Sequence, residues 1–110
     1  MRHDRPINVL IVDDDNEICY LMSRFLNSVD DVKVCGISNS GSDALKKIHT
    51  IKPDIVLLDI MMPQIDGIGV LMKLKNDPPS KMPRIIMTTA IIILGILDGG
   101  SFLSFINTPI

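Results

Sequence analysis

Short apolar runs alternate with segments of helical periodicity, and this alternation restricts the fold more than any other feature of the sequence. The runs are rich in Ile, Val and Leu and cover residues 7–12, 32–37, 54–58, 84–87 and 102–106. A continuous apolar run of this length is typical of a strand that is covered on both faces, as in a parallel sheet. The alternation therefore predicts an α/β fold of parallel βαβ units with right-handed crossovers.

The segments between the first four runs have apolar residues at helical spacing. In the first segment, for which Asp15 or Asn16 is a candidate N-cap, these residues are Ile18, Leu21, Met22, Phe25, Leu26 and Val29. Residues 42–51 predict a second helix, which begins after the turn residues 39–41 and ends before Pro53. A third helix follows the loop IMMPQIDG, with Val70, Leu71 and Leu74 facing inward.

Composition limits the number of domains and the classes of partner. A chain of 110 residues is expected to form one domain, residues 1–110, with a single site. Its net charge of −2 comes from 11 basic and 13 acidic residues that are scattered along the sequence. This distribution gives no basic stripe, so we expect no direct nucleic-acid binding by this chain.

The cysteines and the apolar runs indicate a cytoplasmic protein that does not enter a membrane. Cys19 and Cys35 are not at metal-ligand spacing, and we interpret them as two buried free thiols. The opening residues MRHDRP do not resemble a signal peptide. The most apolar run, residues 85–97, has 13 residues and is too short to span a bilayer.

Acidic residues and a threonine follow three of the predicted strands. Asp13 and Asp14 follow the first run, Asp59 the third and Thr89 the fourth. In open parallel sheets, functional groups gather beyond the carboxyl ends of the strands, so these side chains are expected to share one pocket. Adjacent carboxylates repel one another unless they are solvated or hold a cation, and the set predicts a site for Mg²⁺, or for Mn²⁺ or Ca²⁺ in its place.

A carboxylate beside Mg²⁺ can also attack a phosphoryl group and form an aspartyl phosphate. Asp59 is the candidate nucleophile, because it stands alone at the end of a buried strand. Asp13 and Asp14 would hold the metal, and the Thr89 hydroxyl would donate a hydrogen bond to a phosphoryl oxygen.

The motifs VDDD, LLDIMMPQIDG and IIMTTA resemble the receiver domain of bacterial two-component response regulators. The resemblance implies a flavodoxin-like (CheY-like) doubly wound sheet of five parallel strands in the order 2-1-3-4-5. It also implies that a histidine kinase or phosphotransferase donates the phosphoryl group. Such a domain is a phosphoacceptor and not an enzyme, beyond self-catalysed phosphorylation and dephosphorylation.

The same resemblance assigns roles at the matching positions. Asp59 matches the phosphoacceptor, Asp14 the direct Mg²⁺ ligand, and Asp13 its partner, which acts mainly through water. The backbone carbonyl of Met61 would complete the coordination by the protein. Two further positions match the switch, namely Thr89 (switch hydroxyl) and Phe105 (aromatic switch). Asp15, the third aspartate of the row, is interpreted as a helix cap with no metal role.

Within this family, the segment DGIGVLMKLK followed by KMPRIIM is most similar to the receiver domains of sporulation regulators from endospore-forming Firmicutes. This narrower resemblance implies a role in regulating sporulation transcription. The output domain that binds DNA in such regulators would lie outside this chain.

The last twenty residues depart from the family pattern. Thr108 stands before Pro109, where the family has a lysine whose ammonium contacts the phosphoryl group, and no lysine follows Lys81. There is no charged residue between Arg84 and Asp98, and the chain ends where the family continues into a fifth helix. The sequence therefore predicts a fold that is atypical or truncated after strand four, and a homodimer or domain-swapped assembly through residues 90–110.

Several alternatives remain at this point. A module of the same fold could keep the metal pocket and signal by dimerisation alone, without efficient phosphorylation. A haloacid-dehalogenase-type phosphatase is disfavoured because Glu17 stands where its DxDx[TV] motif has Thr or Val. A calcium-binding EF-hand loop is disfavoured because Ile18 stands where that loop needs glycine. His3 and His49 are interpreted as solvated side chains.

Overall fold

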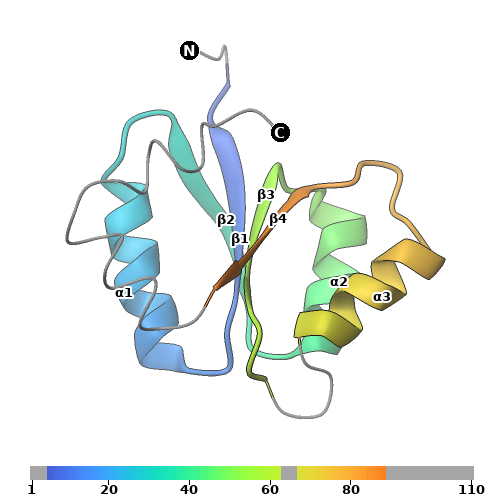
Figure 1. Cartoon of the computed structure of the whole chain (residues 1–110). Coiled ribbons are helices and arrows are strands. Elements are labelled where there is room, and N and C mark those ends of the chain that lie inside the picture. The colour runs from blue at the N-terminus through green and yellow to red at the C-terminus, as the bar shows by residue number, and fades with distance from the viewer. Residues whose placement is uncertain (1–4, 63–66, 89–110) are drawn as a thin grey trace.

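The computed structural model describes residues 5–62 and 67–88, which form four parallel strands and three helices (Figure 1). The strands are β1 (Ile7–Val12), β2 (Val32–Ser38), β3 (Ile55–Asp59) and β4 (Arg84–Thr88). The helices are α1 (Asn16–Asn27), α2 (Gly41–Ile51) and α3 (Gly67–Asn76). The strand order is β2-β1-β3-β4, so the order 2-1-3-4 predicted for the first four strands is confirmed.

The strand boundaries agree with the sequence prediction to within one residue at each end. β3 begins at Ile55 and includes Asp59, so Asp54 lies just before the strand and Asp59 is its last residue. The predicted fifth strand, residues 102–106, and the departures expected over residues 90–110 lie outside the described residues.

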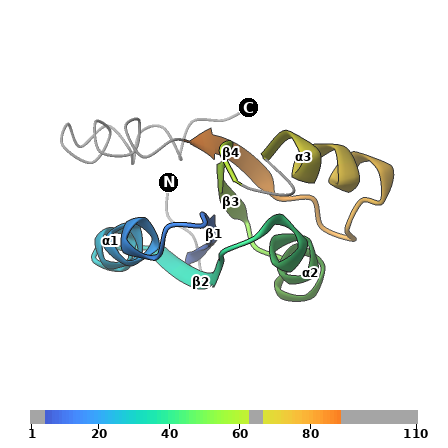
Figure 2. The same ribbon diagram turned by 90° about the horizontal axis from the view of Figure 1, so that it is seen from below.

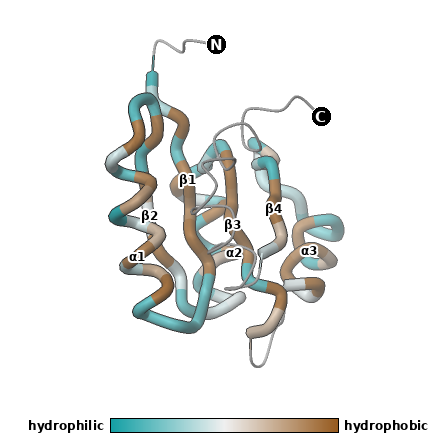
Figure 3. The backbone as a smooth tube through the Cα atoms, turned by 60° about the vertical axis from the view of Figure 1, so that its left-hand side comes forward, coloured by the Kyte–Doolittle hydropathy of each residue, from teal (hydrophilic) through white to brown (hydrophobic). Residues whose placement is uncertain are grey.

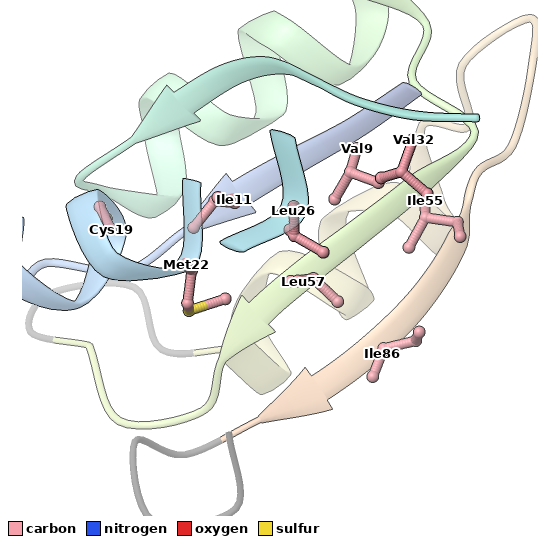
Figure 4. Close-up of a cluster of buried hydrophobic side chains, with 9 residues drawn as sticks. All are labelled: Val9, Ile11, Cys19, Met22, Leu26, Val32, Ile55, Leu57 and Ile86. Carbon is pink, nitrogen blue, oxygen red and sulfur yellow. The ribbon is translucent and has the colours of Figure 1, made fainter. Parts of the chain in front are cut away.

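Helices cover both faces of the sheet, α1 on one and α2 with α3 on the other (Figure 2). Successive residues of a strand point to opposite faces, so β1 contributes Val9 and Ile11 to one core and Leu10 and Val12 to the other. The tube in Figure 3 shows the resulting pattern, with apolar strands at the centre of the molecule. Figure 4 shows the core beneath α1, where Met22 and Leu26 pack over Ile11 and Leu57.

The two cysteines differ in burial. Cys19 is buried in α1, as predicted, whereas the prediction for Cys35 was wrong, because Cys35 is half-buried. Cys35 falls at a register shift in the pairing of β1 with β2, where Val9 pairs with Val34 and Leu10 with Gly36. Cys35 lies between these pairs on β2, an outer strand of the described sheet, where Val34, Gly36 and Ile37 are half-buried as well.

Both thiols are free, and burial raises the pKa of each. In the part of the chain that the structure describes, no helix is long and apolar enough to cross a membrane.

Candidate metal centre

Three carboxylates meet at the carboxyl ends of β1 and β3. These strands are hydrogen-bonded neighbours with Val12 opposite Leu58, so Asp13 and Asp59, the next residues along the chain, come side by side. Carboxylate oxygens of Asp13, Asp14 and Asp59 all lie within 4.8 Å of one another. The predicted convergence of these three residues is therefore present in the structure.

Two of the three carboxylates are buried. Asp13 is 6% exposed and Asp59 is 8% exposed, whereas Asp14 is exposed to solvent. One oxygen of each buried carboxylate accepts a backbone hydrogen bond: Asp13 Oδ1 from the Asp15 N–H at 2.9 Å, and Asp59 Oδ1 from the Met61 N–H at 3.2 Å. Those N–H groups hold each carboxylate in one orientation.

No side chain of the described residues forms an ion pair with these three aspartates. The ion pairs within residues 5–62 and 67–88 involve Asp43 and Asp54. The pKa of Asp13 is raised to about 6, chiefly by burial; the hydrogen bond from the Asp15 N–H opposes this shift, and the charges of Asp59 and Asp14 add to it. A cation in the cluster would offset both the desolvation and the repulsion.

The donor set fits a hard divalent cation. Mg²⁺ prefers carboxylate oxygens, keeps several waters and commonly shares its coordination with a phosphate oxygen. The exposed Asp14 leaves one side of the cluster open to solvent, through which water or a phosphoryl group can enter. Asp13, Asp14 and Asp59 are thus the residues that would hold the ion.

Asp15 has a different task from its two predecessors. Its side chain accepts hydrogen bonds from the N–H groups of Glu17 at 2.9 Å and Ile18 at 3.2 Å, which makes it the N-cap of α1. The interpretation of Asp15 as a cap is therefore confirmed. By starting the helix at once, this cap turns the chain sharply after Asp14 and leaves Asp13 and Asp14 beside the end of β3.

The backbone of Asp13 is fixed by three neighbours. Its N–H donates to Ser38 O at 3.0 Å, and its carbonyl oxygen accepts from Asn39 Nδ2 at 2.9 Å and from Cys19 Sγ at 3.3 Å. Asn39 and Cys19 were not predicted as site residues. The only sequence signal was the position of Asn39 in the turn that follows the second apolar run, and helical periodicity alone assigned Cys19 to the core.

The end of β4 lies beside the acidic cluster. Thr88 pairs with Asp59 across the two strands, and its carbonyl oxygen accepts a hydrogen bond from the Ile60 N–H at 3.2 Å. Thr88 itself is buried. Thr89, Phe105 and Thr108 lie outside the described residues, so their predicted roles, like that of the Met61 carbonyl, remain predictions.

Comparison with known proteins agrees with this geometry. Residues 9–93 match the family model described as the response regulator receiver domain. The chain belongs to this family. Receiver domains function in phosphorylation-based signalling of two-component systems, so the resemblance seen in the motifs VDDD and LLDIMMPQIDG is confirmed at the level of the family.

Among curated relatives, the response regulator protein VraR of Staphylococcus saprophyticus is 37% identical over 87 residues, which are 79% of this chain and 41% of VraR. This chain thus spans about two fifths of that relative. The response regulator domain of Thermotoga maritima CheB is 35% identical with a TM-score of 0.69, over 76% of this chain and 60% of that one.

A second similar structure is the CheX-CheY-BeF3-Mg+2 complex from Borrelia burgdorferi. It is 34% identical with a TM-score of 0.63, and the match covers 76% of this chain and 61% of that one. That complex contains BeF₃ and Mg²⁺.

Proposed function

We propose that this receiver domain accepts a phosphoryl group on Asp59, in the presence of Mg²⁺, from a phosphohistidine of a histidine kinase or phosphotransferase. The observation that supports this proposal most directly is the convergence of the Asp13, Asp14 and Asp59 carboxylates within 4.8 Å. In the transfer, the P–N bond of the donor breaks, a P–O bond to Asp59 forms, and the released imidazole takes up a proton. Mg²⁺ would neutralise the charge that accumulates between the carboxylates and the phosphoryl group.

Asp59 suits the role of acceptor for a geometric reason. Its Oδ1 accepts a hydrogen bond from the Met61 N–H, and no donor among the described residues is bonded to Oδ2, which is therefore the oxygen proposed to attack. Asp59 is the last residue of a fully buried strand, which pairs with β1 as far as Leu58, and Asp59 itself pairs with Thr88 of β4. The flanking strands therefore orient the acceptor before a donor arrives.

The readout is proposed to pass through the end of β4. Phosphorylated Asp59 would attract the Thr89 hydroxyl, and Phe105 would respond on the output face. The position next to Thr89 supports this, because Thr88 pairs directly with Asp59. Thr108, in place of the family lysine, is expected to slow transfer or weaken the readout, since a point charge in such a site stabilises the transition state.

The narrower predictions are kept as part of the proposal. Regulation of sporulation transcription is supported only by the segments DGIGVLMKLK and KMPRIIM, and VraR and the two structures above carry other names. A homodimer through residues 90–110 is supported by the absence of charge between Arg84 and Asp98. A receiver-fold module that acts by dimerisation alone is the second candidate, because Thr108 removes the family's charge. The family match favours both over a haloacid-dehalogenase-type phosphatase.

Intact-mass spectrometry after incubation with Mg²⁺ and acetyl phosphate tests the proposal, with Asp59→Asn as the matched control. One labile phosphoryl group on the wild-type chain, absent from the control, is expected. If Mg²⁺ binds but no adduct forms, phosphoacceptor function is refuted and the dimerising module becomes the better account; light scattering would then report the dimer.

A further inference from the structure

We propose that Asn39 is a positioning residue for the metal centre, because its side-chain amide holds the peptide that joins the two metal-binding aspartates, Asp13 and Asp14. This inference rests on the proposed function. Asn39 Nδ2 donates to the carbonyl oxygen of Asp13 at 2.9 Å.

The peptide that Asn39 holds determines where both carboxylates lie. A peptide unit is planar, so fixing the direction of the Asp13 carbonyl also fixes the N–H and Cα of Asp14. The Asp13 N–H, which belongs to the preceding peptide, donates to Ser38 O at 3.0 Å. Hydrogen bonds therefore hold the peptides on both sides of Asp13. Their partners, Ser38 and Asn39, are consecutive residues at the end of β2.

Asn39 is itself well placed to act as a fixed donor. It lies between Ser38, the last residue of β2, and Ser40, the N-cap of α2. Both serines are tied to Asp43: Ser38 Oγ donates to its Oδ2 at 2.8 Å, and the Asp43 N–H donates to Ser40 Oγ at 3.2 Å. An amide held between two anchored neighbours loses little conformational freedom when it donates its hydrogen bond.

The second donor to the Asp13 carbonyl is weaker. Cys19 Sγ lies 3.3 Å from that oxygen, and a thiol is a weak donor compared with an amide. Asn39 Nδ2 also lies 3.8 Å from Cys19 Sγ, so the two donors meet at the same oxygen. Among the described residues, removal of the Asn39 amide leaves the Cys19 thiol as the side-chain donor to this carbonyl. The Asp13–Asp14 peptide can then rotate more freely.

The test compares Asn39→Ala with Asn27→Ala in the full chain. Asn27 Oδ1 accepts from the Val34 N–H at 3.0 Å, so Asn27→Ala also removes one side-chain-to-backbone hydrogen bond, at the other end of α1. Both side chains are exposed, and both variants are expected to fold. Mg²⁺ affinity is measured by isothermal titration calorimetry, and the free energy of unfolding without Mg²⁺ by urea titration.

Asn39→Ala is expected to weaken Mg²⁺ binding by about three- to tenfold, the effect of losing one hydrogen bond that orients a ligand. Asn27→Ala should bind Mg²⁺ as the wild type does, although both variants lose similar stability. Asn39→Gln, which keeps the amide donor, should recover affinity to within about twofold of the wild type.

Two results would overturn the positioning role alone: equal Mg²⁺ affinity in Asn39→Ala and the wild type, or equal weakening in Asn39→Ala and Asn27→Ala. A wild-type chain that binds no Mg²⁺ would instead refute the proposed function at its first step, and the inference with it. The wild-type titration therefore separates the two failures.

Discussion

The aspartates at the two ends of the sheet lie in opposite electrostatic environments. At the amino end, Asp54 accepts two hydrogen bonds from the Arg5 guanidinium, one from Lys81 Nζ and one from the Asn8 N–H. At the carboxyl end, Asp13, Asp14 and Asp59 lie together, and no lysine or arginine of the described residues pairs with them.

The pKa values record the same difference. The Arg5 hydrogen bond, opposed by burial and aided by Lys81, holds the pKa of Asp54 well below its usual range. Burial raises the pKa of Asp13 to about 6. The charged form is thus favoured at one end of the sheet and disfavoured at the other. The paired Asp54 at the amino end therefore stabilises the fold, whereas the clustered aspartates at the carboxyl end repel one another, and a cation can relieve this repulsion.

The largest effect in this comparison is expected at Asp54. Asp54→Ala should lower the free energy of unfolding at pH 7 by about 3 kcal/mol, because it leaves the Asn8 N–H and two cations without their carboxylate. The backbone of Asp54 joins three strands, since its N–H donates to Asn8 O and its carbonyl oxygen accepts from the Arg84 N–H. Urea titration measures the change.

The effect of Asp54 should also depend on pH. Because its pKa is lower in the folded than in the unfolded state, its contribution is complete above about pH 4 and is lost as the pH falls below that value. The difference between wild type and Asp54→Asn should therefore shrink from pH 7 to pH 3. A difference that stays constant over this range would show that the ion pairs contribute little.

A second, smaller effect is expected where α3 meets the acceptor. A Cβ on Gly67 would lie 2.9 Å from Ile60 Cα and 3.0 Å from Asp59 O, both backbone atoms that cannot move cheaply. Gly67→Ala should lower the free energy of unfolding by about 2 kcal/mol and slow phosphorylation by displacing Asp59.

Gly36→Ala is the matched control for Gly67→Ala. There a Cβ would meet the ends of two flexible side chains, Leu10 Cδ1 at 3.2 Å and Ile51 Cδ1 at 3.4 Å. A smaller loss, with unchanged phosphorylation, is expected. Equal losses in the two variants would mean that the approach of α3 to Asp59 is not specifically tight.

The sequence predicts those features of the fold and the site that follow from hydrophobic periodicity and strand order. Alternating apolar runs predict the strands, and the rule that functional groups gather at the carboxyl ends of parallel strands predicts that Asp13 and Asp59 lie together. The contact of Asn39 with the Asp13 carbonyl could not be predicted in this way, because it depends on the rotamer of one turn residue. The bulge at Cys35 was missed because an apolar run does not show where one residue falls out of register.

The smallest expected effect has the opposite sign and sharpens the comparison most. Asp13→Asn should raise the free energy of unfolding without Mg²⁺ by about 1 kcal/mol at pH 7.5, because it removes a buried charge that Asp59 and Asp14 repel. The asparagine can still accept the Asp15 N–H at Oδ1. Mg²⁺ should then stabilise the variant less than it stabilises the wild type, and urea titration with and without Mg²⁺ measures both changes.

Asp43→Asn is the control for the direction in which Asp13→Asn changes the free energy of unfolding. Hydrogen bonds from Lys47 and Ser38 lower the pKa of Asp43, so its neutralisation should destabilise the fold. For Asp13, whose pKa is raised, the wild-type protein without metal should lose stability as the pH rises from about 4 through about 6, while Asp13→Asn lacks this loss. If Asp13→Asn were less stable than the wild type without Mg²⁺, the carboxylates would not be in conflict, and the contrast between the two ends of the sheet would lose its physical basis.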